Sequence, residues 1–141
     1  MSHDSGEMMK KYIVVKQKQR LTEERKVLFQ GMAEVESQLS CLCIKYKELD
    51  TAAKVHVQAD EKELKIHREA EATTHLHFIA NQKTVCSIES VYGTIELQLY
   101  THKYIKKDNI IAISYDVLDG DIVSDSFYII WTIEEGVRES D

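Results

Sequence analysis

The stretch IAISYDVLDGDIVSDSFYIIWTI, residues 111–133, decides the fold of this chain. Apolar side chains occupy every second position of the runs that flank the dipeptide Asp119-Gly120. A period of two is the pattern of a strand with one buried face. Asp-Gly between two such runs is a strong hairpin signal. The run Ile95–Leu99 repeats the alternation upstream, so the C-terminal third predicts three antiparallel strands.

Shorter runs of the same kind continue toward the N-terminus, separated by polar turns. With the three clear runs they make eight to ten strands at a spacing of about 8–12 residues, which is typical of a sandwich or a barrel. A chain of 141 residues corresponds to one domain. We therefore expect an all-β domain over residues 10–136, with short tails at 1–9 and 137–141.

The segment Lys26–Leu49 allows a second interpretation. Its apolar residues also fit a helical seam with alternating spacings of four and three. The residues on that seam are Leu28, Met32, Val35, Leu39, Leu42, Tyr46 and Leu49. Periodicity alone leaves strand and helix nearly balanced here.

Charge and composition limit the classes of partner. The chain carries 18 basic and 24 acidic residues, a formal net charge of −6. This balance disfavours binding to nucleic acid or to acidic membranes, because both depend on a basic surface. Lys16, Lys18 and Arg20 do alternate on one face of the first run, which we interpret as a solvated strand face.

The sequence indicates an intracellular protein. No run approaches the ~18 apolar residues of a membrane-spanning helix, and the polar N-terminus has no signal-peptide pattern. The three cysteines are an odd number, which favours free thiols in a reducing cytoplasm. We expect a cytoplasmic protein without membrane insertion.

No motif for catalysis, phosphate binding or a cofactor stands out, so we predict neither an enzyme nor a cofactor. His75 and His77 project from the same side of one strand and would need a third ligand to hold a metal ion. Leu76 and Phe78 point the other way, so the histidines belong on the wet face and we predict no metal site. Cys86 has no nucleophile motif around it.

Four segments resemble the small bacterial proteins grouped with YwiB, a domain of unknown function described as a calycin-like (lipocalin-like) β-barrel. They are Phe29-Gln30-Gly31, Ile44-Lys45-Tyr46-Lys47-Glu48, Tyr92-Gly93-Thr94-Ile95-Glu96-Leu97 and Ile113-Ser114-Tyr115-Asp116. The resemblance runs from about Tyr12 to Glu134. It implies a single, mainly antiparallel calycin-like barrel, and strands in Lys26–Leu49. It implies no activity.

A barrel of this size has an interior that is either filled by side chains or able to hold one small ligand. Phe78, Tyr115 and Trp131 share the apolar phase of their runs, and Arg68 follows the phase of Leu64 and Ile66. We therefore predict that Arg68, Phe78, Tyr115 and Trp131 line a site for a small lipophilic or amphipathic ligand. Arg68 would meet a carboxylate.

A second hypothesis is a protein-interaction module with a filled barrel. An exposed edge strand, or an outer aromatic face made of Tyr100, Tyr104 and Tyr128, would then bind a partner or form a homodimer.

Overall fold

The computed structural model describes residues 8–134, and most of the two expected tails lies outside these residues. The first strand begins at Met8, inside the expected N-terminal tail. Ten strands follow one another within the described range. They are β1 (Met8–Gln19), β2 (Glu24–Gln38), β3 (Cys41–Lys47), β4 (Lys54–Ala59), β5 (Glu63–Glu69), β6 (Thr73–Ile79), β7 (Lys83–Ser90), β8 (Gly93–Lys107), β9 (Ile110–Asp119) and β10 (Ile122–Glu134).

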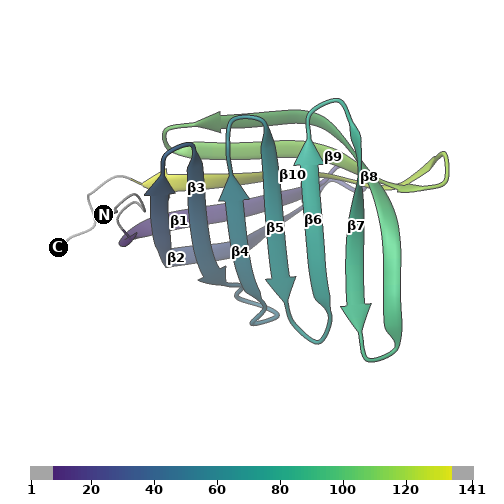
Figure 1. The fold of residues 1–141 in the computed structure, drawn as a ribbon, viewed down its shortest axis with the longest axis horizontal. Coiled ribbons are helices and arrows are strands. Elements are labelled where there is room, and N and C mark those ends of the chain that lie inside the picture. The colour runs from purple at the N-terminus through teal and green to yellow at the C-terminus, as the bar shows by residue number, and fades with distance from the viewer. Residues whose placement is uncertain (1–7, 135–141) are drawn as a thin grey trace.

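Each strand pairs antiparallel with its neighbour in the chain, and β1 pairs with β10 to close the barrel. In Figure 1, β3 to β7 run up and down the view, whereas β9, β10 and β1 run across it. The barrel therefore has two faces whose strands cross. The all-β, antiparallel barrel expected from the sequence is confirmed. No helical segment in the described part of the chain has the length and apolar character needed to cross a bilayer.

The region that sequence periodicity left undecided consists of β2 and β3. The helical interpretation is wrong, because two residues of the proposed seam lie on the surface: Met32 is 52% exposed and Leu39 is 98% exposed. Leu39 lies in the turn between the two strands. Val35 pairs with Ile44 across that hairpin, and both are buried. The apolar side chains therefore follow the strand period in the residues that form the core.

The interior is packed mainly with aliphatic side chains. Ile13, Ile44, Leu64 and Ile111 are each fully buried there. An aromatic group lies among them, opposite Ile111 in the ladder between β9 and β10. Its centre is Trp131, whose Nε1 donates a hydrogen bond of 3.0 Å to the Tyr46 hydroxyl.

The hairpin predicted at Asp119-Gly120 is present, with Gly120 as the first residue of the turn. Gly120 has a φ of 65°, a left-handed conformation that glycine adopts without steric cost. Asp119 pairs with Ile122, so β9 and β10 keep the register that places their apolar residues inside.

One expected surface residue faces inward instead. Tyr104 packs against the core and its hydroxyl donates to the backbone carbonyl of Asp60. The cause is a β-bulge between Thr101 and Lys103, because one extra residue reverses the side on which later side chains project. The outer aromatic face proposed from Tyr100, Tyr104 and Tyr128 is therefore wrong at its middle member. The closed ladder also leaves no full-length free edge strand in the described residues.

The pairing between β6 and β7 is shorter than the strands themselves. Only Thr73, Thr74 and His75 of β6 pair with β7. Beyond them the strands separate, and the Thr84 side chain donates to the backbone carbonyl of His77 across the gap. The β6–β7 turn then bonds to Thr101 of β8. This seam has the fewest ladder pairs among the strand pairs of residues 8–134.

We predict that Tyr46→Phe destabilises the barrel by about 1–2 kcal/mol, because it leaves the buried indole N–H of Trp131 without an acceptor. Urea unfolding measures the change. Tyr128→Phe is the matched control, since Tyr128 is 36% exposed, and its free energy of unfolding should change by less than about 0.5 kcal/mol. Equal changes in the two variants would contradict the role assigned to the Tyr46 hydroxyl.

Candidate functional site

A chamber of about 230 Å³ lies inside the barrel, at the end where the β3–β4 loop crosses the mouth. The four residues predicted from the sequence all line it: Arg68, Phe78, Tyr115 and Trp131. They come from two hairpins that lie far apart in the chain, β5–β6 and β9–β10. The alternation of buried and exposed residues brings them together because all four occupy inward positions. That they bind a ligand stays a prediction.

The aromatic wall consists of side chains in direct contact. The rings of Phe78 and Tyr115 have centroids 4.7 Å apart, and those of Phe29 and Tyr46 are 4.9 Å apart. Trp131 contacts this group through its hydrogen bond to Tyr46. Tilted aromatic pairs at these separations are favourable beyond their buried area, so the wall is preorganised.

Two buried phenols lie at the chamber. Burial raises the pKa of Tyr46 and of Tyr115 far above the ordinary value, so both stay protonated at neutral pH. Tyr115 is 6% exposed. Among the described residues, no hydrogen bond reaches its hydroxyl. The hydroxyl oxygen is not fully enclosed, since Thr101 Oγ1 is the one fully buried side-chain polar atom without a partner in residues 8–134. The Tyr115 hydroxyl is therefore available to a polar ligand atom or to water.

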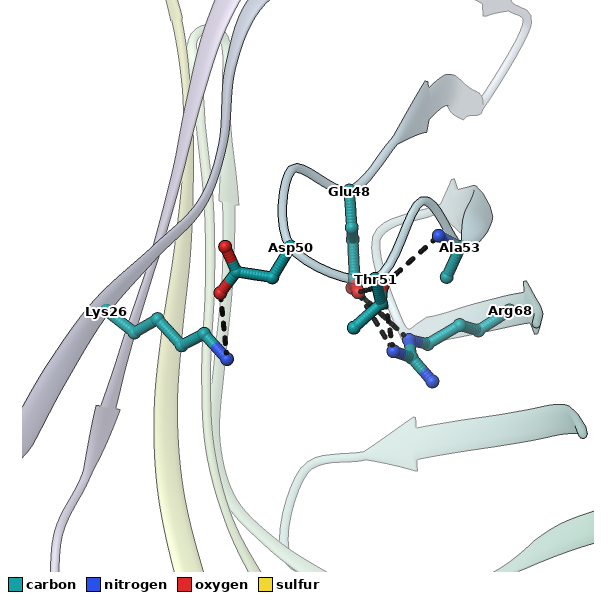
Figure 2. A network of polar contacts seen from close by, with 6 residues as sticks. All are labelled: Lys26, Glu48, Asp50, Thr51, Ala53 and Arg68. Carbon is teal, nitrogen blue, oxygen red and sulfur yellow. Dashed lines mark hydrogen bonds and ion pairs between the residues drawn. The ribbon is translucent and has the colours of Figure 1, made fainter. Parts of the chain in front are cut away.

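A charged pair closes the mouth (Figure 2). Arg68 Nη2 lies 2.9 Å from Glu48 Oε1, and Arg68 Nε lies 3.2 Å and 3.3 Å from the two carboxylate oxygens of Glu48. The Glu48 side chain is 12% exposed and that of Arg68 is 31% exposed. The guanidinium therefore reaches the carboxylate through two donors at a half-shielded site, which makes the contact charge-assisted and directional.

The same loop is held at two further points. Thr51 Oγ1 donates to Glu48 Oε1 at 2.9 Å, and Lys26 Nζ on β2 lies 3.3 Å from Asp50 Oδ2. Figure 2 shows Glu48 and Asp50 reaching in different directions from one loop, toward Arg68 and Lys26 respectively. Ala52 in this loop has a φ of 57°, which is unfavourable for a residue with a Cβ. Residues 48–53 thus form a strap whose ion pairs fix it across the chamber.

Sequence reasoning missed Tyr46 and Glu48 as members of this site. A usable signal existed, because Leu42, Ile44, Tyr46 and Glu48 share one phase of their run and Leu42 and Ile44 are buried. Continuing that phase to Glu48 places a carboxylate at the barrel mouth. Its pairing with Arg68, 20 residues away, requires the three-dimensional register.

The histidines lie outside the barrel, as their phase indicated. His75 Nδ1 is 3.2 Å from His67 Nδ1, and His77 Nε2 is 2.5 Å from Glu63 Oε1. Each therefore has its own neighbour. Residues 8–134 contain no group of three or more His, Cys, Asp or Glu side chains arranged to hold a metal ion.

The cysteines are not placed for nucleophilic chemistry. Cys86 is 3% exposed, and burial raises the pKa of its thiol. Burial, with the adjacent Cys41, raises the pKa of Cys43 to about 11. Thiols in this state are poor nucleophiles at neutral pH, since the thiolate is the reactive form. Cys86 packs in the core whereas His75 lies on the outer surface, so the structure does not join them into a Cys–His pair.

Comparison with known proteins supports the fold and adds no activity. The crystal structure of the ywiB protein from Bacillus subtilis superposes with a TM-score of 0.77, at 18% sequence identity, over 95% of this chain and 96% of that chain. At this identity the likeness shows the fold alone. A search of curated proteins gave no match. The family model described as "Domain of unknown function (DUF1934)" matches residues 12–127. Because that match covers most of the chain, the protein belongs to the DUF1934 family.

Proposed function

We propose that this protein binds a small molecule with an apolar body and one carboxylate in the chamber behind the strap. The observation that carries the proposal is the composition of the wall. Phe78, Tyr115 and Trp131 surround the space, Tyr115 brings a hydroxyl that no hydrogen bond reaches among the described residues, and Arg68 stands at the mouth. Apolar walls with a few convergent polar groups are the usual character of small-molecule sites.

The volume sets the size of the ligand. A chamber of about 230 Å³ corresponds to roughly eight water molecules, at about 30 Å³ each. Sites for drug-sized ligands are usually above about 300 Å³. The proposed ligand is therefore an acid with a short or medium chain or a single ring, and a long-chain lipid would not be enclosed.

The charges of the wall support an anionic ligand. Lys26 and Arg68 line the chamber as cations, and each already binds a carboxylate of the strap, Asp50 and Glu48 respectively. Glu48 occupies the position on Arg68 that a ligand carboxylate would take. Binding then exchanges one carboxylate for another on the same guanidinium, and the strap that carries Glu48 is the element that moves.

We predict that octanoate, which has a suitable size and charge, changes the fluorescence of Trp131 saturably. Trp131 is the single tryptophan of the chain, so its emission reports the chamber alone. Octan-1-ol is the matched control because it has the same body and no carboxylate, and it should bind more weakly. Native mass spectrometry of protein purified from cells tests the same proposal through retained mass. A bare protein that gains no mass and shows no fluorescence change across short-chain and aromatic acids would contradict it.

Substitutions at the charged pair should change octanoate binding in opposite directions. Glu48→Gln leaves the Arg68 guanidinium without its carboxylate, so we expect about tenfold tighter binding. Arg68→Gln removes the donor, so we expect binding weaker by about tenfold or more, as hydrogen bonds to charged groups are worth about 1.5–3 kcal/mol. Fluorescence titration measures both.

Octan-1-ol binding should be unchanged in both variants, and Glu61→Gln on the exposed β4–β5 turn should change neither ligand. Equal effects on the acid and the alcohol would show that Arg68 does not recognise the carboxylate.

A further inference from the structure

A second hollow lies on the outside of the barrel, over β1, β2, β8, β9 and β10. It is an open groove of about 1350 Å³, several times larger than the chamber. Its lining contains the outward side chains of β1 that alternate with the buried ones, Lys16 and Lys18, followed by Arg20. Arg25 on β2 and Lys103 on β8 bring to five the lining cations that have no ion pair among the described residues, whereas a sixth, Lys26, is paired with Asp50.

These cations lack acidic partners. Among the described residues, no ion pair involves Lys16, Lys18, Arg25 or Lys103. Asp116 also lines the groove, but its carboxylate is already engaged by His102 at 2.8 Å and by the Ser126 hydroxyl at 2.8 Å. In a chain of net charge −6, the groove therefore concentrates positive charge that the surrounding protein does not neutralise.

The register places two of the cations directly opposite each other. Lys18 pairs with Arg25 across the β1–β2 ladder, and Lys18 pairs with Tyr128 on its other side. Like charges opposite each other on a sheet are destabilising. The row continues from Tyr128 to Ser114 and from Ser114 to Lys103, so cations flank a central tyrosine across five strands.

The shape of the groove follows from backbone irregularities. Three register shifts occur in the described ladders, at Val15/Lys16, at Thr101/Lys103 and at Val123/Asp125. All three fall in strands that line the groove. A β-bulge bends its strand and increases the local twist, and bulges are common beside functional sites. The barrel wall is thus curved where the unpaired cations gather.

We propose that this groove binds single-stranded nucleic acid. Five cations along a groove match the charge of a phosphate backbone. The groove also offers aromatic and apolar surface that phosphates would not contact. Tyr128 is 36% exposed there, and Val27 and Val123 are 40% and 42% exposed. Binding of single strands combines cations for the phosphates with aromatic and apolar surface for unpaired bases. A duplex or an acidic peptide would use only the cations.

Net charge led us to expect no binding to nucleic acid. The proposal differs from that expectation because the positive charges are not spread evenly over the surface. The acidic total disfavours non-specific binding over the whole surface, whereas the cations of β1, β2 and β8 are gathered in one place. Binding should therefore be local and sensitive to salt. The groove and the chamber share Gln17 and Lys26 in their linings, but Glu48 and Arg68 line the chamber alone, so variants of these two residues should leave binding in the groove unchanged.

The test is fluorescence anisotropy with a labelled oligouridylate of about 16 nucleotides, the upper end of single-stranded site sizes. We expect binding at low salt that falls with salt concentration, with a log–log slope of at most about 3.5 for five phosphate contacts. Lys18→Glu/Arg25→Glu should weaken it by more than tenfold, and Tyr128→Leu by about 5- to 150-fold, the range of one stacked base. Lys65→Glu/Lys83→Glu, exposed on β5 and β7, is the charge-matched control.

Circular dichroism of each variant checks that the barrel is intact. Absence of binding, or equal loss in the control and the groove variants, would overturn the proposal. A duplex of the same length that binds as tightly as the single strand would overturn it as well. Polyglutamate that displaces the oligouridylate equally well from the unmodified protein and from Tyr128→Leu would overturn it too, because the groove would then bind an anionic chain without bases.

A second measurement separates this role from a structural one. Arg25→Thr removes the like-charge opposition with Lys18, so we expect Tm to rise by about 1–4 °C. The same variant should weaken oligouridylate binding severalfold. If Arg25 only stabilised the barrel, Arg25→Thr would lower the Tm and leave oligouridylate binding unchanged, which is the opposite result.

Discussion

The closed ladder of backbone hydrogen bonds is the constraint on which the rest of the molecule depends. Because β1 pairs with β10, every strand has a neighbour on each side over part of its length, and successive side chains of a strand point alternately into and out of the barrel. A sheet closed in this way removes its edges. Whether a residue occupies an odd or an even position along its strand therefore decides if its side chain can belong to the core and chamber or to the outer groove.

Much of this could be predicted from the sequence, for that reason. Alternation gave the strands, and phase alone assigned Arg68, Phe78, Tyr115 and Trp131 to one interior although they lie on four strands. Phase fails where the backbone departs from a regular pleat. The bulge after Thr101 turns Tyr104 inward. The sequence gives no sign of this bulge, since residues 94–107 contain neither Gly nor Pro.

Pairing between distant charges is the second kind of information that local pattern lacks. Glu48 and Arg68 meet because β3, β4 and β5 are in register, with Tyr46 opposite Val55 and Val55 opposite Arg68. Net charge likewise does not show where the charged residues lie on the surface. An acidic chain can carry a basic surface when its cations alternate along strands that become neighbours, as Lys18 and Arg25 do. Both charged features described here arise from register rather than composition.

The short seam between β6 and β7 has a mechanical consequence for the interior. Phe78 forms part of the chamber wall, and it lies in the portion of β6 that has no ladder bonds to β7. A segment bonded on one side only costs less free energy to displace than one bonded on both. Phe78 therefore lies on the side of the barrel where displacing the wall costs the least free energy, and a change in the enclosed volume would begin there without breaking the ring of strands.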